Sequence, residues 1–200
     1  MSLMSLEIKS FSGGDARPFL DDVARLRIAV FRDFPYLYDG DPDYERGYLA
    51  TYARSAGAVF VIARDGGRIV GASTGMPMED ETDAVKAPFL AAGRKPEAHF
   101  YFGESVLLPA YRGRGIGVTF FAEREAAARK LGKRFCTFCA VERPADHPRR
   151  PAGYVPLNDF WTKRGYRHHP ELRTTFTWRD LDEDAESPKP LSFWLRDIGG

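Results

Sequence analysis

The feature that most constrains this chain is a glycine-rich turn between an apolar segment and a helical one. Residues 112–117 read Arg-Gly-Arg-Gly-Ile-Gly and follow the apolar segment 99–108. Glycine leaves the backbone open to an anion because it carries no side chain. The following helix directs unpaired N–H groups and the positive end of its dipole into the same space. The sequence therefore predicts a phosphate- or pyrophosphate-binding turn, formed by Arg112, Gly113, Arg114, Gly115, Ile116 and Gly117.

Two other phosphate-binding loops do not fit this spacing. A Walker loop ends in Gly-Lys-Ser/Thr, whereas Gly117 is followed by Val118 and Thr119. The dinucleotide fingerprint needs Gly-x-Gly-x-x-Gly and an acidic residue at the end of the next strand. The glycines here alternate, and the next strand-like segment begins with Lys133 and Arg134. A nucleotide-dependent enzyme is therefore disfavoured.

Length, charge and hydropathy limit the class of protein. The 200 residues suit one domain with a sizeable core. Twenty-nine basic and 28 acidic residues leave a formal charge of +1, and no block of like charge suggests a nucleic-acid arm. No apolar run reaches the roughly 20 residues of a membrane span, and the first residues show no signal-peptide pattern. We expect a cytoplasmic protein that binds neither nucleic acid nor membrane.

The two cysteines and the paired histidines do not indicate a metal site. Cys136 and Cys139 lie in an apolar segment typical of a buried strand, where residues three apart point to opposite faces. We interpret them as two small buried side chains rather than a redox pair. His168 and His169 have no nearby cysteines or spaced second pair, so we expect no metal ligands.

Hydrophobic periodicity predicts the element order β-α-α-β-β-β-α-β-α-β. In chain order, the segments are 6–11, 17–34, 41–54, 58–64, 68–75, 99–108, 117–131, 134–141, 157–164 and 166–180, the last supplying one or two strands. The polar stretch 79–95 is expected to insert a helix or a lid. We therefore expect one domain over residues 5–180, followed by an acidic linker and an apolar tail at 181–200 that packs back on it.

The turn and the element order resemble the GNAT acetyltransferase superfamily. Its signature is Arg/Gln-x-x-Gly-x-Gly/Ala after a strand that ends in Pro-x-Tyr-Arg-Gly, and residues 109–117 match it. Residues 157–166 also resemble a later family motif, a short helix that ends in Tyr-x-Lys-x-Gly-Phe. The resemblance implies an α/β (α+β) fold with a central mixed, twisted sheet of six to seven strands. That sheet would splay after the fourth strand, with helices on both faces and acetyl-CoA in the gap.

The resemblance also implies an activity and assigns roles to residues. It implies an acyltransferase that moves an acetyl or similar acyl group from CoA to a primary amine by direct attack on the thioester. In the family, an unpaired strand amide binds the thioester carbonyl, and counting back from the signature arginine places that amide at Leu107. Asn158 lies near the family's polar contacts to CoA, and N-cap of the short helix is its equal alternative. The implied co-substrate is acetyl-CoA, without a metal.

Glu104 is the candidate proton acceptor because it is the one carboxylate in the segment before the turn. Partial desolvation there would make it a better base. Its strand parity matches Phe102 and Val106 rather than the face that the family uses for substrate, and a β-bulge would reverse that parity. Catalytic base and buried structural carboxylate are equal alternatives at this point.

One departure from the family pattern leaves a second function open. Trp161 stands where many members carry a tyrosine that protonates the departing thiolate, and an indole N–H does not titrate. The departing thiolate would then be protonated by water, Tyr111 or Tyr166, or would leave without a general acid. The alternative function is a non-catalytic acyl-CoA-binding or sensor domain.

The acceptor and the assembly are less constrained by the sequence. We expect a small-molecule amine rather than a protein lysine, because an aromatic loop and a proline-stiffened arginine loop suggest a walled pocket. The residues offered by these loops are Tyr36, Tyr38, Asp39, Asp41, Arg143, His147, Arg149 and Arg150. A homodimer is the alternative to a monomer.

Overall fold

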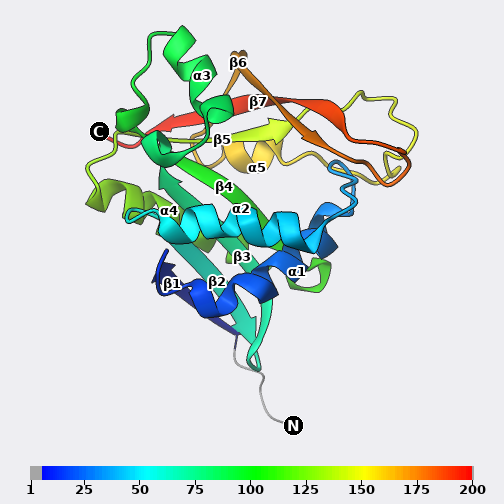
Figure 1. Cartoon of the computed structure of the whole chain (residues 1–200), viewed down its shortest axis with the longest axis horizontal. Helices are drawn as coiled ribbons and strands as arrows, with labels where there is room; N and C mark the ends of the chain where they lie inside the picture. Colours follow the sequence, from blue (N-terminus) through cyan, green and yellow to red (C-terminus); the bar gives the residue numbers. More distant parts are fainter. Residues whose placement is uncertain (1–5, 200) are drawn as a thin grey trace.

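A computed structural model describes residues 6–199 of the chain. It contains a seven-stranded mixed sheet with the strand order β1-β2-β3-β4-β5-β7-β6 (Figure 1). The strands are Leu6–Ser12 (β1), Val59–Asp65 (β2), Arg68–Pro77 (β3), His99–Leu107 (β4), Phe135–Val141 (β5), Arg167–Trp178 (β6) and Ser187–Asp197 (β7). The α-helices are Leu20–Phe31 (α1), Pro42–Arg54 (α2), Asp83–Ala91 (α3), Ile116–Lys130 (α4) and Asn158–Thr162 (α5). Short 3-10 helices lie at Arg17–Phe19 (η1), Met78–Asp80 (η2), Pro96–Ala98 (η3) and Pro109–Tyr111 (η4).

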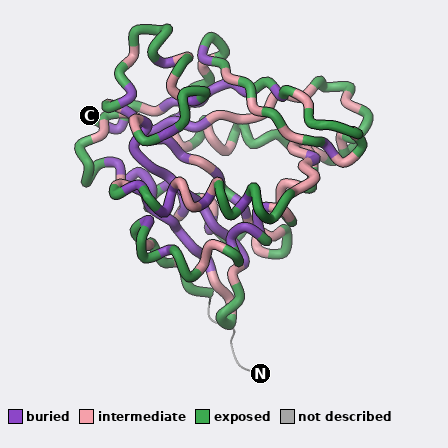
Figure 2. The backbone as a smooth tube through the Cα atoms, in the orientation of Figure 1, coloured by how far each residue is buried: buried purple, intermediate pink, exposed green. Residues whose placement is uncertain are grey.

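Helices cover both faces of the sheet, as the predicted fold class requires. On the face that α1 and α2 cross in Figure 1, Val23 and Leu49 pack against Phe60. On the opposite face, Phe120 of α4 packs against Val61. Because neighbouring residues of β2 point to opposite faces, the sheet separates two cores. Figure 2 shows the buried backbone running along the central strands.

Local sequence signals fix the starts of the two helices that border the site. The Asp41 carboxylate caps α2 by accepting a hydrogen bond from the Tyr44 N–H at 2.7 Å, and Pro42 occupies the first helical position. Gly115 is the N-cap of α4 with a left-handed backbone, φ 81°. Both helix starts agree with the sequence prediction to within one residue.

The sheet splays between β4 and β5. These two strands run parallel and pair only at their first three positions, from His99 with Phe135 to Tyr101 with Thr137. The rest of each strand has no partner across this gap among the described residues. The predicted splay after the fourth strand is confirmed, and it leaves the edge of residues 102–107 that faces β5 without a partner strand.

A β-bulge interrupts β4 at the edge of this gap. Ser73 pairs with Ser105 and Gly75 pairs with Phe102, so Thr74 lies opposite both Gly103 and Glu104. The extra residue reverses the face to which Glu104 points.

The buried Arg124 of α4 holds this bulge in place. Its guanidinium donates hydrogen bonds to the backbone carbonyls of Thr74 at 3.2 Å and Glu104 at 3.0 Å, and to the Ser105 hydroxyl at 2.7 Å. The positive charge has no carboxylate partner here, and burial lowers its pKa to about 10. The bulge is therefore tied to α4 through one side chain.

The expected boundary at residue 180 does not coincide with the edge of the sheet. Ser187–Asp197 forms β7, which lies between β5 and β6 and pairs with both. Pro188 and Pro190 obscured this strand in the sequence, because proline inside a run argues against a central strand. The last strand is thus an interior part of the domain rather than a tail on its surface.

Two further findings concern residues 6–199. None of their helices is long and apolar enough to cross a bilayer. No group of three or more His, Cys, Asp or Glu side chains there is placed to hold a metal ion. Cys136 and Cys139 are free thiols that belong to different hydrophobic clusters on opposite sides of β5, as strand geometry predicts.

Candidate active site

The glycine-rich turn borders a cavity of about 1210 Å³, which we call the turn-side cavity. Gly113 and Gly115 have φ angles of 75° and 81°, in the left-handed region that favours glycine. The turn then continues directly into α4, whose first N–H groups have no partners within the helix. Among the residues expected to bind the anion, those that line this cavity are Leu107, Arg112, Gly113, Gly115, Gly117 and Asn158.

The side chains of Arg114 and Ile116 lie outside this lining. The Arg114 guanidinium stacks on the Tyr111 ring, 5.1 Å from its centroid. Ile116 is buried in the core beneath α4. The structure therefore brings only some of the side chains of the turn to the cavity, and Arg112 is the arginine of the turn that lines it.

Asn158 stands at the start of α5, but the N-cap of that helix is Leu157. The alternative that Asn158 caps the helix is therefore wrong. Its amide group lies at the wall of the turn-side cavity, beside Phe160 and Trp161.

The backbone of Leu107 points its N–H into the gap between β4 and β5. The next N–H, that of Leu108, donates to the Val70 carbonyl at 2.9 Å on the β3 side. Successive residues of a strand direct their N–H groups to opposite edges. The Leu107 N–H therefore faces the edge from which β5 has departed, which is the orientation that carbonyl binding requires.

Glu104 is buried on the α1–α2 side of the sheet and is ion-paired. Its carboxylate accepts a hydrogen bond from Arg27 at 2.8 Å and one from the Tyr48 hydroxyl at 3.2 Å. Arg27 also pairs with the buried Glu45, so one guanidinium serves two buried carboxylates. Because of the bulge, the parity that Glu104 was expected to share with Phe102 does not hold.

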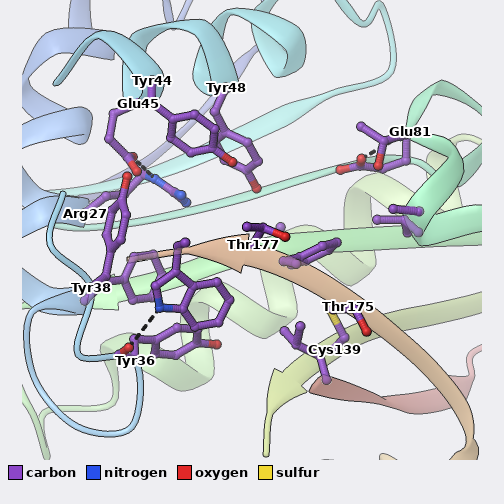
Figure 3. A pocket seen from close by; sticks show the side chains of 18 of the residues that line it. Arg27, Tyr36, Tyr38, Tyr44, Glu45, Tyr48, Glu81, Cys139, Thr175 and Thr177 are labelled. Carbon is purple, nitrogen blue, oxygen red and sulfur yellow. Dashed lines mark hydrogen bonds and ion pairs between the residues drawn. The ribbon is translucent and has the colours of Figure 1, made fainter. Parts of the chain in front are cut away.

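A second cavity of about 390 Å³ lies on the other side of the gap, and we call it the aromatic cavity (Figure 3). Its walls come from α1, the loop 36–38, α2, the segment 81–85, β4, β5, β6 and β7. Aromatic side chains are the largest group among the lining residues: Phe31, Tyr36, Tyr38, Tyr44, Tyr48, Tyr101, Phe176 and Trp178. The charged groups are Arg27 and Glu45 on one side and Glu81 on the other.

Glu81 and Glu104 are joined by two tyrosine hydroxyls. Tyr52 donates to Glu81 at 2.5 Å, and the Tyr48 hydroxyl lies 3.1 Å from the Tyr52 hydroxyl and 3.2 Å from the Glu104 carboxylate, with one hydrogen to donate to either. Burial raises the pKa of Glu81 above its ordinary value, so its protonated form is favoured more than in water. Two buried carboxyl groups thus end one hydrogen-bonded chain.

The two cavities meet where the sheet splays. Phe31, Tyr36, Gly103 and Cys139 line both of them, and Gly103 comes from β4 and Cys139 from β5. A Cβ on Gly103 would lie 2.4 Å from the Tyr52 hydroxyl oxygen and 2.6 Å from the Thr74 hydroxyl oxygen. Glycine at this position therefore lets the tyrosine chain approach β4 directly beside the gap.

The tyrosines considered as proton donors are engaged elsewhere. The Tyr111 hydroxyl donates to Asp65 at 2.8 Å, and the buried Tyr166 hydroxyl donates to Glu125 at 3.0 Å. Trp161 lines the turn-side cavity and packs between Phe138 and Trp194. Neither tyrosine is among the residues that line the cavity.

The loops expected to bind an acceptor divide between several roles. Tyr36 and Tyr38 line the aromatic cavity. Arg143 is neutralised by Asp180, at 2.7 and 2.9 Å, and Arg150 lines the turn-side cavity instead. Of the remaining residues, Asp39 pairs with Arg179, Asp41 caps α2, His147 packs at a tilt against Phe34 and Arg149 pairs with Asp182.

Sequence reasoning missed Arg27, Glu81 and the tyrosines of α2. A usable signal was present for Arg27, which follows Val23 by four residues and precedes Val30 by three, inside the apolar stripe of its helix. Glu45 precedes Leu49 by four residues and Tyr52 by seven, so it also lies in the apolar stripe of its helix. Charged residues at two such positions indicate a buried ion pair. Glu81 carries no comparable signal, because it lies in an irregular segment.

Comparison with known proteins agrees with this geometry. The chain matches the model of the family described as acetyltransferase (GNAT) over residues 23–152. No curated protein sequence matches it.

Several solved structures share the fold at low sequence identity. A ribosomal-protein-alanine N-acetyltransferase from Brucella melitensis has a TM-score of 0.61 and 14% identity, covering 96% of this chain and 99% of that one. The yncA protein from Salmonella typhimurium, solved with its cofactor acetyl-CoA, has a TM-score of 0.61 and 10% identity over 98% and 95%. PaiA N-acetyltransferase from Thermoplasma acidophilum, in complex with coenzyme A, has a TM-score of 0.55 and 13% identity over 98% and 100%. At these identities the similarity establishes the fold.

Proposed function

The chain belongs to the GNAT acetyltransferase family, and on that premise we propose that it transfers an acetyl group from acetyl-CoA to a primary amine of a small molecule. The observation that carries the proposal is that two chemically different cavities meet at the gap between β4 and β5. A donor in the turn-side cavity and an amine in the aromatic cavity would face each other across Gly103.

The residues of the turn-side cavity fit the CoA part of the donor. The backbone from Gly113 to Gly117 and the start of α4 would hold the pyrophosphate, with charge from Arg112 and a polar contact from Asn158. Bound acetyl-CoA would supply an activated acyl thioester. The Leu107 N–H would donate to its carbonyl oxygen, and a preorganised donor of this kind typically lowers a barrier by about 3–4 kcal/mol.

Direct transfer to the amine is favoured over an acyl-enzyme. Cys139 is the thiol that lines both cavities. Burial raises its pKa to about 12, so it is protonated at neutral pH and is a weak nucleophile. The amine itself would therefore attack the carbonyl carbon, form the C–N bond and release the thiolate of CoA.

The attacking amine must lose a proton, and we propose that the chain from Glu81 to Glu104 takes it. An alkylammonium has a pKa of about 10.4, so a nearby base is needed at neutral pH. Glu81 lines the aromatic cavity, and its raised pKa makes it a stronger base than an exposed carboxylate. Glu104, the acceptor proposed from the sequence, would act through Tyr48, because its carboxylate is already paired with Arg27.

The leaving thiolate needs no general acid in this proposal. A thiol pKa of about 8.5 makes the thiolate a tolerable leaving group. Trp161 would instead shape the cavity near the thiol, since its indole ring packs between two aromatic neighbours.

Two measurements test the proposal. Isothermal titration with acetyl-CoA, CoA and ATP should show binding of the two CoA species and none of ATP. A thiol-release assay with a panel of primary amines should show acetyl-CoA-dependent turnover. ATP binding without CoA binding would overturn the role of the turn, and CoA binding with no turnover on any amine would favour an acyl-CoA-binding or sensor domain.

A further inference from the structure

We propose that the acceptor is an arylalkylamine: a primary amine with a flat apolar body and no carboxylate. This inference rests on the proposed acetyl transfer and concerns what the aromatic cavity accepts. Its volume of about 390 Å³ lies within the range of small-molecule pockets.

The walls of the cavity favour a flat apolar body. Tyr36 and Trp178 lie with their ring centroids 6.0 Å apart, and Tyr38 and Tyr44 lie on the same side of the cavity, away from Glu81 (Figure 3). Aromatic side chains present large rigid faces with few rotatable bonds, and another ring stacks on them or meets them edge-on. A flexible polar chain would gain little from such walls.

The charges of the cavity favour an ammonium and oppose a carboxylate. Arg27 is the sole basic side chain among the described residues that line it. Its guanidinium is already paired with Glu45 and Glu104 and stacks on Tyr48, 4.2 Å from the ring centroid. A substrate carboxylate would therefore be buried beside carboxylates without a free cation, which is costly.

The position of Glu81 indicates which end of the amine faces the donor. Tyr52 bonds to Glu81, and its hydroxyl also lies against Gly103 at the gap. An ammonium held near Glu81 would thus lie beside the junction of the two cavities. The apolar body would then extend toward Tyr36 and Tyr38, which lie across the cavity from Glu81 in Figure 3.

A second ammonium group is disfavoured by the same arrangement. The side of the cavity away from Glu81 holds Arg27, with Glu45 engaged by it (Figure 3). A polyamine would place its distal charge among aromatic rings, where the Glu45 carboxylate is fully buried and already held by Arg27. The geometry therefore separates arylalkylamines from both amino acids and polyamines.

The test compares matched acceptors on the whole protein. Phenethylamine, tyramine and tryptamine are paired with phenylalanine, tyrosine and tryptophan, which add only the carboxylate, and spermidine is a third arm. We expect each arylalkylamine to exceed its amino acid in kcat/KM by at least about a hundredfold, because the added carboxylate would be buried unpaired. Equal or better turnover of the amino acids or of spermidine would overturn the inference.

Binding without acetyl-CoA distinguishes this inference from the proposed transfer. Calorimetry with the same amines should give the same order of affinities. Ordered binding with no thiol release would leave the inference standing and refute the transfer, whereas binding of none of the arylalkylamines would refute the inference.

Variants of Trp178 give a matched check on the walls. Trp178→Ala should raise the KM for tryptamine at least about fivefold, because a stacking face is lost, with acetyl-CoA affinity unchanged. Trp178→Phe keeps an aromatic face and should stay close to the wild type. An unchanged KM in the alanine variant would count against the aromatic wall.

Discussion

The two cavities on either side of the gap are built in different ways. The anion-binding part of the turn-side cavity uses backbone: the left-handed Gly113 and Gly115, the start of α4 and the outward Leu107 N–H, all within residues 107–117. The aromatic cavity is lined by residues from α1, the loop 36–38, α2, the segment 81–85, β4, β5, β6 and β7. One site is local in the sequence, and the other is assembled from distant segments.

This difference explains why one site supports a family assignment and the other determines specificity. A backbone site tolerates little change, because it depends on glycine conformations and helix position. A side-chain site can change its chemistry by substitution while the strands stay in place. We therefore expect variants in the aromatic cavity to change turnover and acceptor choice, and variants in the turn to change CoA binding.

The largest expected effect is on stability, in the ion-pair cluster that supports the aromatic cavity. Arg27→Leu would leave Glu45 and Glu104 buried without a cation, and removal of one partner from a buried pair typically costs about 3–5 kcal/mol. Urea unfolding should show this loss. Arg25→Leu on the same helix removes an exposed pair with Asp22 and should change the free energy of unfolding by less than about 1 kcal/mol.

A stable Arg27→Leu protein would show that these carboxylates are protonated or reach water. This result would contradict the contrast between the two cavities, because the aromatic cavity would then not depend on a fixed cluster of charged side chains. Acetyl-CoA affinity of the folded fraction should be unchanged, because Arg27 is not among the residues that line the turn-side cavity.

The next effect is on turnover. Glu81→Gln should lower kcat at least about a hundredfold, the lower end for general-base catalysis, with little change in acetyl-CoA affinity. Glu79→Gln is the control, because Glu79 lies two residues away and pairs with Lys133. Glu104→Gln should lower kcat less and reduce stability more, since it removes a partner of Arg27.

The pH profile separates Glu81 from a structural role. A carboxyl group accepts a proton only above its pKa, and burial raises the pKa of Glu81 above its ordinary value of 4.5. The acidic limb of the kcat/KM profile should therefore lie above the ordinary range of a glutamate carboxyl in the wild type and change in Glu81→Gln. An unchanged limb with unchanged kcat would assign the proton to water or another group.

A smaller effect is expected for glycine substitutions in the turn. Gly115→Ala puts a Cβ on a residue with φ +81°, a strain of about 1–2 kcal/mol. We expect the Kd for CoA to rise about tenfold, which corresponds to about 1.4 kcal/mol, with kcat at saturation little changed. Isothermal titration measures this Kd.

Gly132→Ala is the matched control for that strain. Gly132 follows the opposite end of α4 with φ +68°, and a Cβ at either glycine meets no atom within 4 Å. Both variants should lose similar stability in thermal melts, while only Gly115→Ala loses CoA affinity. Equal CoA affinities in the two variants would show that the anion site lies elsewhere.

The extent of sequence-based prediction follows the same division. The turn, the cap of α2 and the splay agree with expectation, because glycine spacing and the capping residue act locally and the splay came with the family resemblance. The face of Glu104 depends on a bulge stabilised by Arg124, a residue 20 positions away. β7 was missed because its prolines hide a strand that lies inside the sheet. Long-range packing, rather than local propensity, determined each miss.

The smallest effect is expected for Trp161, the residue of the turn-side cavity that departs from the family pattern. Trp161→Tyr restores the residue that many family members carry, and it removes part of a ring that packs 5.0 Å from Phe138 and 5.1 Å from Trp194, centroid to centroid. If thiolate departure needs no acid, kcat should change by less than about threefold, below the range for acid catalysis. Stopped-flow thiol release on the whole protein, with Trp161→Phe as the control without a hydroxyl, measures it. A rise of tenfold or more in the tyrosine variant alone, on the order of general-acid catalysis, would mean that protonation of the thiolate limits the wild-type rate. A side chain would then limit the rate in the turn-side cavity as well. The contrast between a cavity built from backbone and one built from side chains would not hold near the thiol of CoA.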